Sequence, residues 1–277
     1  MRVLLRPSRN SPNFPRGVPV EVAVSSFSDE RSLRAAMKDV DTIFHLAGAE
    51  RYGLKGDLNQ IDINGTAMLV KAAQQSNVKH IFYLSHLGAD RASAYPVLKS
   101  KGIAENWIVD SGIPYTIFRT ASIFGPGDQL TEPILKLLKI SPGIFLVPNN
   151  GRTLLQPLWV DDLVTCLMLA YEDERMKNRL LSIGGIEMLS YMDIVKMIMQ
   201  RTGVKRIPVN VTPQFLQSFT LWIDQIYPKF PISIFWLDQL AEDRVTALDS
   251  IPREFSLMPS RMKNHLDYLV GSPKQGR

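Results

Sequence analysis

The first 120 residues alternate short apolar runs with helical patterns, and this alternation limits the possible folds more than any other feature. The runs that read as strands are RVLLR (2–6), VEVAV (20–24), TIFHLA (42–47), HIFYLS (80–85) and YTIFR (115–119). Helical spacing is found in the segments between them, at 28–40, 57–76 and 97–110. Strands that alternate with helices predict a parallel sheet covered by helices. We therefore expect an α/β protein with a doubly wound sheet.

The regular alternation of strand and helix patterns ends after about residue 125, where Pro and Gly become frequent. We predict a core over 1–125 and a smaller mixed lobe over 126–277, with 154–185 returning to the core. Those returning residues contain a predicted strand (154–160), a helix (161–173) and the run NRLLSIGG (178–185). A mostly helical, aromatic segment follows at 215–240. Core packing explains these aromatic residues more simply, but an exposed patch here would mark a protein partner.

Composition excludes several classes of protein. The chain has 277 residues, is 45% hydrophobic and carries a formal charge of +5 that forms no basic run, so nucleic-acid binding is not predicted. Cys166 is the only cysteine, which excludes an internal disulfide framework and favours the cytoplasm. No apolar run approaches the ~18 residues of a membrane span. The histidines lack the spacing of a metal site.

Several motifs together resemble the short-chain dehydrogenase/reductase superfamily in its extended and atypical branch. They are VDTIFHLAG (40–48), NGT (64–66), IFYLS (81–85), SKGIAE (100–105), RTASIFGPGD (119–128), LQPLWVDDLV (155–164) and SIGG (182–185). Within the superfamily, the chain resembles the NmrA-like group, which includes the nucleotide-binding accessory subunit of respiratory complex I. The resemblance implies a Rossmann-type fold and an NAD(P)-dependent oxidoreductase or epimerase/dehydratase acting on an unidentified small molecule.

One part of the family pattern is absent from the 277 residues. By this resemblance RVLLRPSR corresponds to the family's second strand, so the first strand, its glycine-rich turn and the first helix are missing. That turn normally holds the cofactor pyrophosphate at a helix N-terminus. We expect the neighbouring strands to face a gap and dinucleotide binding to be weak. A misplaced start and a natural remnant that has lost the cofactor remain alternative explanations.

The resemblance also assigns a cofactor site. Arg6 and Arg9 follow the second strand, where arginine suits a ribose 2′-phosphate, so NADP is favoured and NAD remains possible. Ser26 and Phe27 correspond to the residues near the adenine. The turn after the 42–47 strand, Leu46, Ala47 and Gly48, would pass the cofactor ribose. Phe124 and Gly125 would meet the nicotinamide half.

The implied catalytic residues are Ser85, which polarises the substrate oxygen, and Lys101, which also holds the cofactor. The family's tyrosine belongs four residues before the lysine, but Val97 stands there. Tyr95 and Lys99 form a second tyrosine–lysine pair, offset by two residues from positions 97 and 101. Two residues rotate a helix by roughly 200°, so the two pairs cannot both face one cleft. His86 could replace the proton donor, although a spectator histidine is the simpler interpretation. The missing tyrosine keeps open the alternative of a non-catalytic scaffold or assembly factor.

Overall fold

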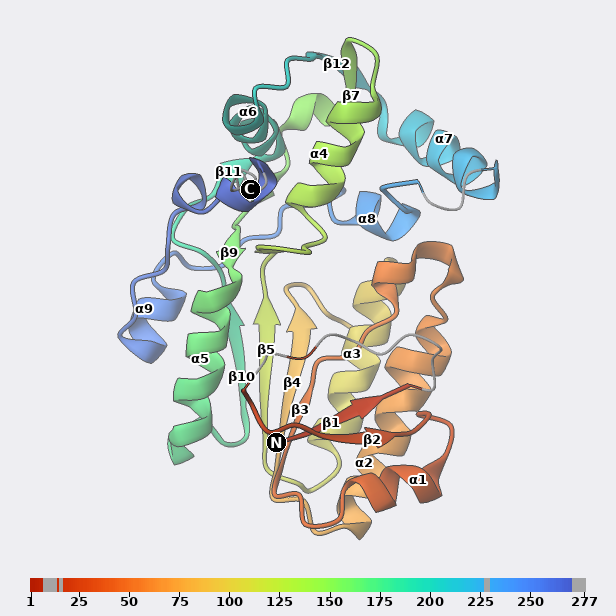
Figure 1. The fold of residues 1–277 in the computed structure, drawn as a ribbon, viewed down its shortest axis with the longest axis vertical. Helices are drawn as coiled ribbons and strands as arrows, with labels where there is room; N and C mark the ends of the chain where they lie inside the picture. The colour runs from red at the N-terminus through yellow and green to blue at the C-terminus, as the bar shows by residue number, and fades with distance from the viewer. Residues whose placement is uncertain (7–13, 15–16, 227–229, 271–277) are drawn as a thin grey trace.

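The computed structural model describes residues 1–6, 14, 17–226 and 230–270, with the side chains of 51, 54 and 224–226 excepted. The described chain forms two lobes, the lower and upper halves of Figure 1. The lower lobe is a parallel sheet with helices on both faces, which confirms the predicted α/β class. The upper lobe is mixed and is built mainly from residues after 130.

Four parallel strands make the main sheet, in the order β10 (Arg179–Ile183), β5 (Tyr115–Thr120), β4 (His80–His86) and β3 (Thr42–His45). One face packs against α2 (Gly65–Gln75) and α3 (Pro96–Val109), and the other packs against α5 (Val160–Glu172) and α9 (Ser250–Phe255). Alternate side chains point to opposite faces of a strand, so Ile81 and Tyr83 join the α2–α3 cluster and Phe82 joins the α5–α9 cluster. β3 and β10 fall within predicted runs, and β4 and β5 extend one residue beyond theirs.

The remaining two strands of this lobe, β1 (Arg2–Leu5) and β2 (Glu21–Val24), form a separate parallel pair. They are followed by α1 (Glu30–Ala36), whose N-cap is Asp29. In the described part of the chain no strand joins β1 to β3, so each has an open edge. Figure 1 shows the pair directed across the strands of the main sheet.

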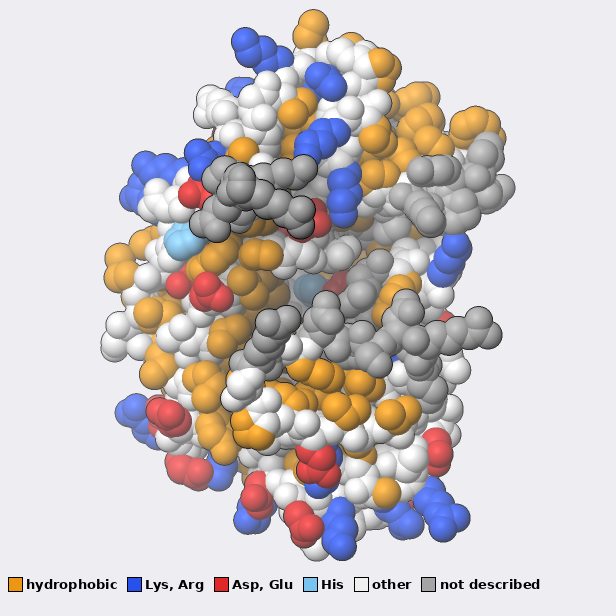
Figure 2. All heavy atoms as spheres, viewed as in Figure 1, with side chains coloured by type: hydrophobic (Ala, Val, Ile, Leu, Met, Phe, Trp, Pro, Cys, Tyr) orange, Lys and Arg blue, Asp and Glu red, His pale blue; other side chains and the backbone are white. Residues whose placement is uncertain are grey.

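Apolar side chains are exposed next to these open edges. Phe44 and Leu46, in and just after β3, are 39% and 55% exposed. On α5, Val164, Met168 and Tyr171 repeat at helical spacing and are also exposed. Figure 2 shows hydrophobic side chains gathered along α5 and in front of the N-terminal strands. The lower lobe therefore leaves uncovered an apolar face that a complete doubly wound sheet would bury.

The second lobe is organised by α4 (Thr131–Ile140), α6 (Tyr191–Thr202), α7 (Pro213–Ile226) and α8 (Ile234–Asp238). Three short strand pairs accompany them: β6 (Ile123–Phe124) with β9 (Leu158–Trp159), β7 (Ile144–Pro148) with β12 (Ile207–Val211), and β8 (Leu154–Leu155) with β11 (Leu189–Ser190). A π-helical segment lies at Asn59–Asn64. Short 3-10 helices lie at Glu50–Lys55, Asn149–Gly151, Glu174–Met176, Met262–Asn264 and Asp267–Val270.

The single strand predicted over 154–160 is wrong as one element. It divides into β8 and β9 at Pro157, because proline has no N–H for a strand ladder. The Pro157 carbonyl lies against Gly185, where an added Cβ would approach its oxygen to 1.9 Å. This close approach explains the second glycine of the SIGG motif.

Candidate functional site

A cavity of about 300 Å³ opens between the lobes, at the end of the main sheet where β4 and β5 finish. Its walls come from 86–87, 95–98 and 120–130, and from α8 and Arg244 in the second lobe. Figure 2 shows the molecule hollowed between its two halves. In open parallel sheets, ligands bind beyond the carboxyl ends of the strands, so this cavity is where a substrate is expected.

A histidine and a glutamate form the clearest polar contact in the cavity wall. The Nε2 atom of His86 lies 2.8 and 2.9 Å from the two carboxylate oxygens of Glu50. Both side chains are about three-quarters buried, at 29% and 26% exposed. Burial alone would raise the pKa of the Glu50 carboxyl, but the charges of His86, Lys101 and Arg244 and the His86 hydrogen bond lower it to about 2. Glu50 is therefore ionised at neutral pH.

Other titratable groups line the same cavity from the opposite side. Tyr95, the residue before α3, has its ring 6.0 Å from the Arg244 guanidinium and its hydroxyl 3.4 Å from Glu242. Burial and the neighbouring Glu242 raise the pKa of Tyr95, so its phenol keeps its proton. Arg244 donates to the backbone oxygens of Leu87 and Asp238 and so ties the second lobe to the end of β4.

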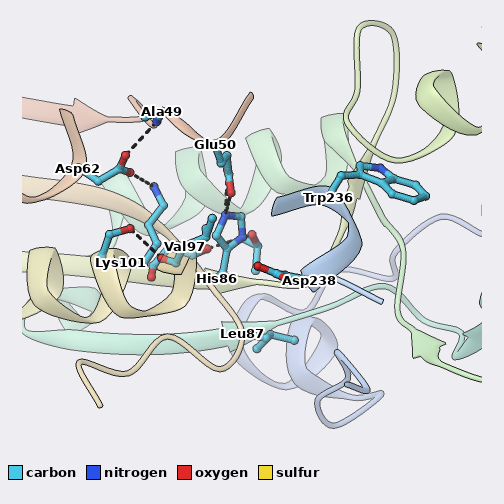
Figure 3. A network of polar contacts seen from close by, with 12 residues as sticks. Ala49, Glu50, Asp62, His86, Leu87, Val97, Lys101, Trp236 and Asp238 are labelled. Carbon is cyan, nitrogen blue, oxygen red and sulfur yellow. Dashed lines mark hydrogen bonds and ion pairs between the residues drawn. The ribbon is translucent and has the colours of Figure 1, made fainter. Parts of the chain in front are cut away.

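Behind the cavity, Lys101 and Asp62 form a buried ion pair. Lys101 Nζ lies 3.2 Å from Asp62 Oδ1, and the two side chains are only 4% and 1% exposed. The second oxygen of Asp62 accepts a hydrogen bond from the Ala49 backbone N–H at 2.9 Å. Burial alone would lower the pKa of Lys101, but Tyr83 and the carboxylates of Asp62 and Glu50 raise it. Figure 3 shows this pair beside the Glu50–His86 pair.

The predicted catalytic residues lie in this buried layer rather than in the cavity wall. Ser85 is completely buried, and its Oγ has no hydrogen-bond partner among the described residues. Lys101 faces Asp62 and lies 5.2 Å from the centre of the Tyr83 ring. Val97 and Tyr95 line the cavity, whereas Lys99 is exposed to solvent. Tyr95 and Lys99 therefore do not form a pair facing the cavity.

Three of the predicted cofactor residues follow β3. Leu46 is exposed and Ala47 is half-buried. Gly48 lies directly above the buried ion pair, because an added Cβ would be 3.3 Å from Lys101 Nζ and 3.4 Å from Asp62 Oδ1. A larger residue at Gly48 would thus press against the Lys101 ammonium group, which is already almost fully buried.

The predicted adenine-side residues are separated from the cavity. Arg6 is exposed just after β1, and Arg9 lies outside the described residues. Ser26 forms a hydrogen bond with the Ser28 hydroxyl at 2.8 Å. Phe27 packs edge-on against His45 and against Gly65, which gives it a packing role in the lower lobe.

Phe124 and Gly125 belong to the GPGD turn in the cavity wall. Phe124 is fully buried against Trp159, and Gly125 has a φ of +152°, which favours glycine. Asp128 holds the turn because its carboxylate accepts the backbone N–H groups of Gly125, Leu130, Thr131 and Glu132. The motif therefore shapes the cavity and starts α4.

Sequence reasoning missed Glu50, Asp62 and Arg244 as members of the site. A signal existed for Asp62, since a lone carboxylate stands between Ile61 and Ile63 in a predicted helix. Glu50 follows the predicted strand end by only a few residues, where side chains reach the sheet's ligand-binding edge. Arg244 carried no signal, because only the folded chain brings it to Leu87.

His45 gives the lower lobe a pH-dependent stability. Its Nε2 bonds the Thr66 hydroxyl at 2.9 Å, and burial together with the Lys101 charge lowers its pKa from 6.5 to about 3. The unfolded chain binds a proton between these values and the folded one does not, so stability falls as pH drops from about 6.5 toward 3. We expect the urea midpoint of His45→Gln to change less with pH in that range than the midpoint of the wild type does. The control His265→Gln should keep the wild-type slope. Equal slopes in wild type and His45→Gln would contradict this assignment.

The described residues contain no group of three His, Cys, Asp or Glu side chains placed to hold a metal ion. Cys166 is buried in the core, and burial raises the pKa of its thiol to about 12. In the described ranges, no helix is both long and apolar enough to cross a membrane.

Residues 1–130 match the family described as NAD(P)H-binding. The matched residues make up a little under half of the chain. This match covers the β1–β2 pair and much of the cavity wall, so the open sheet edge lies within the matched residues. The resemblance to short-chain dehydrogenases and reductases is thereby confirmed, as is the Rossmann-type fold.

Curated relatives and solved structures agree with this assignment. The chain is 25% identical to the photosystem II assembly factor Ycf39 of Trieres chinensis, over 83% of this chain and 69% of that one. It is 22% identical to the mitochondrial NADH dehydrogenase [ubiquinone] 1 alpha subcomplex subunit 9 of Arabidopsis thaliana, over 99% and 73%. The NADP(H) complex of Citrobacter sp. triphenylmethane reductase has the same fold, with a TM-score of 0.71 at 19% identity over 90% and 84%.

Proposed function

We propose that the protein is an atypical NAD(P)H-dependent oxidoreductase or epimerase of the extended short-chain type, acting on a small molecule in the cavity between the lobes. The observation that carries this proposal is the hydrogen-bonded pair Glu50–His86 in the wall of that cavity, at the carboxyl end of the sheet. Proton-transfer groups in a mostly apolar pocket are typical of an active site.

The described residues suit the two ends of a dinucleotide but not its middle. Arg6 is exposed at the end of β1, where it can approach a ribose phosphate, and this favours NADP. Gly48 brings the backbone close to the Lys101 ammonium, beside which the other ribose would lie. No glycine-rich turn is present among the described residues to hold the pyrophosphate. The cofactor would supply the transferred hydride, and the protein would bind, orient and protonate the substrate.

We assign Lys101 and Ser85 to the layer that supports the reacting groups. The ammonium of Lys101 lies next to Gly48, and its charge helps to keep Glu50 ionised. Ser85 precedes His86 at the end of β4, and its unpartnered hydroxyl would be free to polarise an oxygen that entered the layer. Leu46 and Ala47, with Phe124 and Gly125, would line the nicotinamide end of the cofactor, and Ser26 and Phe27 would lie toward the adenine.

Turnover is the direct test of this function. The full chain should oxidise millimolar NADPH in the presence of apolar aldehydes or ketones such as benzaldehyde and acetophenone. A Gly125→Val variant should lose this activity, because a side chain at Gly125 would meet Val160 Cγ1 at 2.6 Å and deform the cavity wall. A folded wild-type protein that oxidises neither NADPH nor NADH with any carbonyl probe would contradict an oxidoreductase.

A second candidate function is a non-catalytic subunit or assembly factor. Val97 at the position of the family's tyrosine favours it, and two relatives are named for roles in protein assemblies. On α7, Phe215 and Trp222 are 53% and 61% exposed and lie two turns apart on one face. That face would suit a protein partner. Binding of a partner that is lost in Trp222→Ser, without any turnover, would favour this function over the first.

The cofactor preference gives a separate prediction about Arg6. We expect Arg6→Ala to lower kcat/KM for NADPH by about tenfold and to leave kcat/KM for NADH unchanged, because one charge-assisted contact to the 2′-phosphate is lost. Arg261→Ala, which removes an exposed arginine in the second lobe, is the matched control. The ratio kcat/KM can be measured below saturation. An equal loss with both dinucleotides would exclude Arg6 as the phosphate contact.

A further inference from the structure

His86 is the group in the cavity wall best placed to exchange a proton with a bound ligand. Five other titratable side chains line the cavity: Glu50, Tyr95, Asp128, Asp238 and Arg244. Glu50 is held ionised, and the Tyr95 phenol holds its proton more tightly than usual. Asp128 is occupied by the hydrogen bonds of its turn. Figure 3 shows His86 between Glu50 and Asp238.

Glu50 fixes which ring nitrogen of His86 remains available. A carboxylate only accepts hydrogen bonds, so the Nε2 atom of His86 must carry a proton and donate it to Glu50. In the neutral ring, Nδ1 is then the acceptor, and it has no hydrogen-bond partner among the described residues. A carboxylate that fixes the histidine tautomer in this way also stabilises the imidazolium that forms when Nδ1 takes a proton.

We propose that His86 Nδ1 is the acid/base atom of this site and that Glu50 is its positioning residue, an assignment that rests on the proposed function. The substrate class is an apolar alcohol or carbonyl compound whose oxygen lies against Nδ1. When a hydroxyl is deprotonated, its O–H bond breaks, the electron pair stays on oxygen and the proton forms the N–H bond at Nδ1. The reverse transfer protonates the oxygen of a reduced carbonyl. His86 would thus take the acid/base role of the family's tyrosine, whose position is occupied here by Val97.

The lining of the cavity supports the substrate class. Apart from the titratable groups and the GPGD turn, its walls are mainly apolar, with Leu87, Val97, Leu98, Ile123, Phe124, Val160 and Phe235. Such walls bind an aliphatic or aromatic body and leave a single oxygen to be recognised by His86. A sugar nucleotide would instead need many hydrogen-bond partners and a phosphate site.

The test uses 4-nitrophenol, an apolar hydroxyl compound whose phenolate absorbs visible light, and it needs no dinucleotide. We expect the wild-type chain to bind it and to convert part of the bound ligand to phenolate at a pH where the free phenol is mostly neutral. His86→Gln should bind it without that conversion. The glutamine amide nitrogen lies where Nε2 was and keeps the bond to Glu50, but nothing replaces Nδ1. His265→Gln is the control and should behave as wild type.

Each result decides the proposal. Equal phenolate signals in wild type and His86→Gln would overturn it, as would the absence of 4-nitrophenol binding at millimolar concentration. In ¹⁵N-histidine spectra, wild-type His86 should be the Nε2-protonated tautomer, and Glu50→Gln should lose this preference. If His86 in Glu50→Gln kept the wild-type tautomer, Glu50 would have no positioning role and that part of the proposal would be overturned. If the chain turns over NADPH, His86→Gln should lower kcat by about 10²- to 10⁴-fold with little change in KM.

A failure of the proposed function gives a different result. In that case NADPH oxidation is absent in the wild type, but the phenolate signal and its loss in His86→Gln remain. The cavity would then be a proton-transfer site without dinucleotide chemistry. A failure of the His86 assignment leaves NADPH oxidation intact in His86→Gln.

Discussion

We expect a purified polypeptide of residues 1–277 to bind NADPH with a dissociation constant of about 1 mM or weaker. The pyrophosphate of a dinucleotide is normally held by backbone N–H groups of a glycine-rich turn at a helix N-terminus. The described residues contain no such turn, and the edges of β1 and β3, between which it would lie, are open. The match to the NAD(P)H-binding family therefore concerns the fold, whereas affinity depends on groups that the described residues do not supply.

The size of the effect follows from the lost contacts. Charge-assisted hydrogen bonds contribute about 1.5–3 kcal/mol each, so losing two or three weakens binding by about 2 to 6 powers of ten. Arg6 and the Gly48–Lys101 layer remain for the ends of the cofactor. Neither compensates for the middle, because both lie at positions expected to contact ribose groups.

Isothermal titration with NADPH measures this affinity directly. The matched comparison is a chimera in which a strand, a glycine-rich turn and a helix precede Met1, together with the same chimera carrying valines in place of the glycines. The first chimera should bind at least a hundredfold more tightly than residues 1–277, and the second should not. Micromolar binding by residues 1–277 in a folded sample would mean that the phosphates are held elsewhere.

The strands of the lower lobe were predictable because burial on both faces leaves a strong local signal. Each of β1 to β5 agrees with its predicted run to within two residues at either end, since parallel strands need continuous apolar residues. The β7–β12 pair was not predicted. Its strands are about sixty residues apart, and exposed residues of β12 such as Ile207 and Val209 give no clear alternation. The pairing depends on where α4 and α6 pack, which no local pattern encodes.

The site could be predicted only in part. Motifs located Ser85, Lys101 and the GPGD turn in the sequence, but they did not predict that Lys101 would turn toward Asp62 and away from the cavity. A family motif identifies a residue's position in the sequence, but it does not show which charged side chain will contact that residue in the folded protein. His86 was considered from sequence as a substitute donor. Its contact with Glu50 depends on the turn at Glu50–Lys55, whose conformation is set by tertiary packing against α8.

The second large effect concerns the stability of the buried ion pair. We expect Lys101→Met to lower the free energy of unfolding by about 3–5 kcal/mol, because it leaves the Asp62 carboxylate buried without its counter-charge. The exposed pair Lys79–Asp41, at 2.7 Å, is the control, and Lys79→Met should cost about 0–1 kcal/mol. Urea unfolding measures both changes. Similar costs for the two substitutions would show that the Lys101–Asp62 pair is hydrated in solution.

A double variant separates this structural role from a catalytic one. In Lys101→Met with Asp62→Asn, the amide oxygen can still accept the Ala49 N–H and no charge remains buried, so most of the lost stability should return. If Lys101 also serves the reaction, this folded double variant still lacks turnover, whereas a purely structural lysine would give a double variant that works. Inactivity of a single Lys101→Ala variant would not distinguish the two roles, since removal of the ammonium alone is expected to unfold the layer that carries Glu50 and His86.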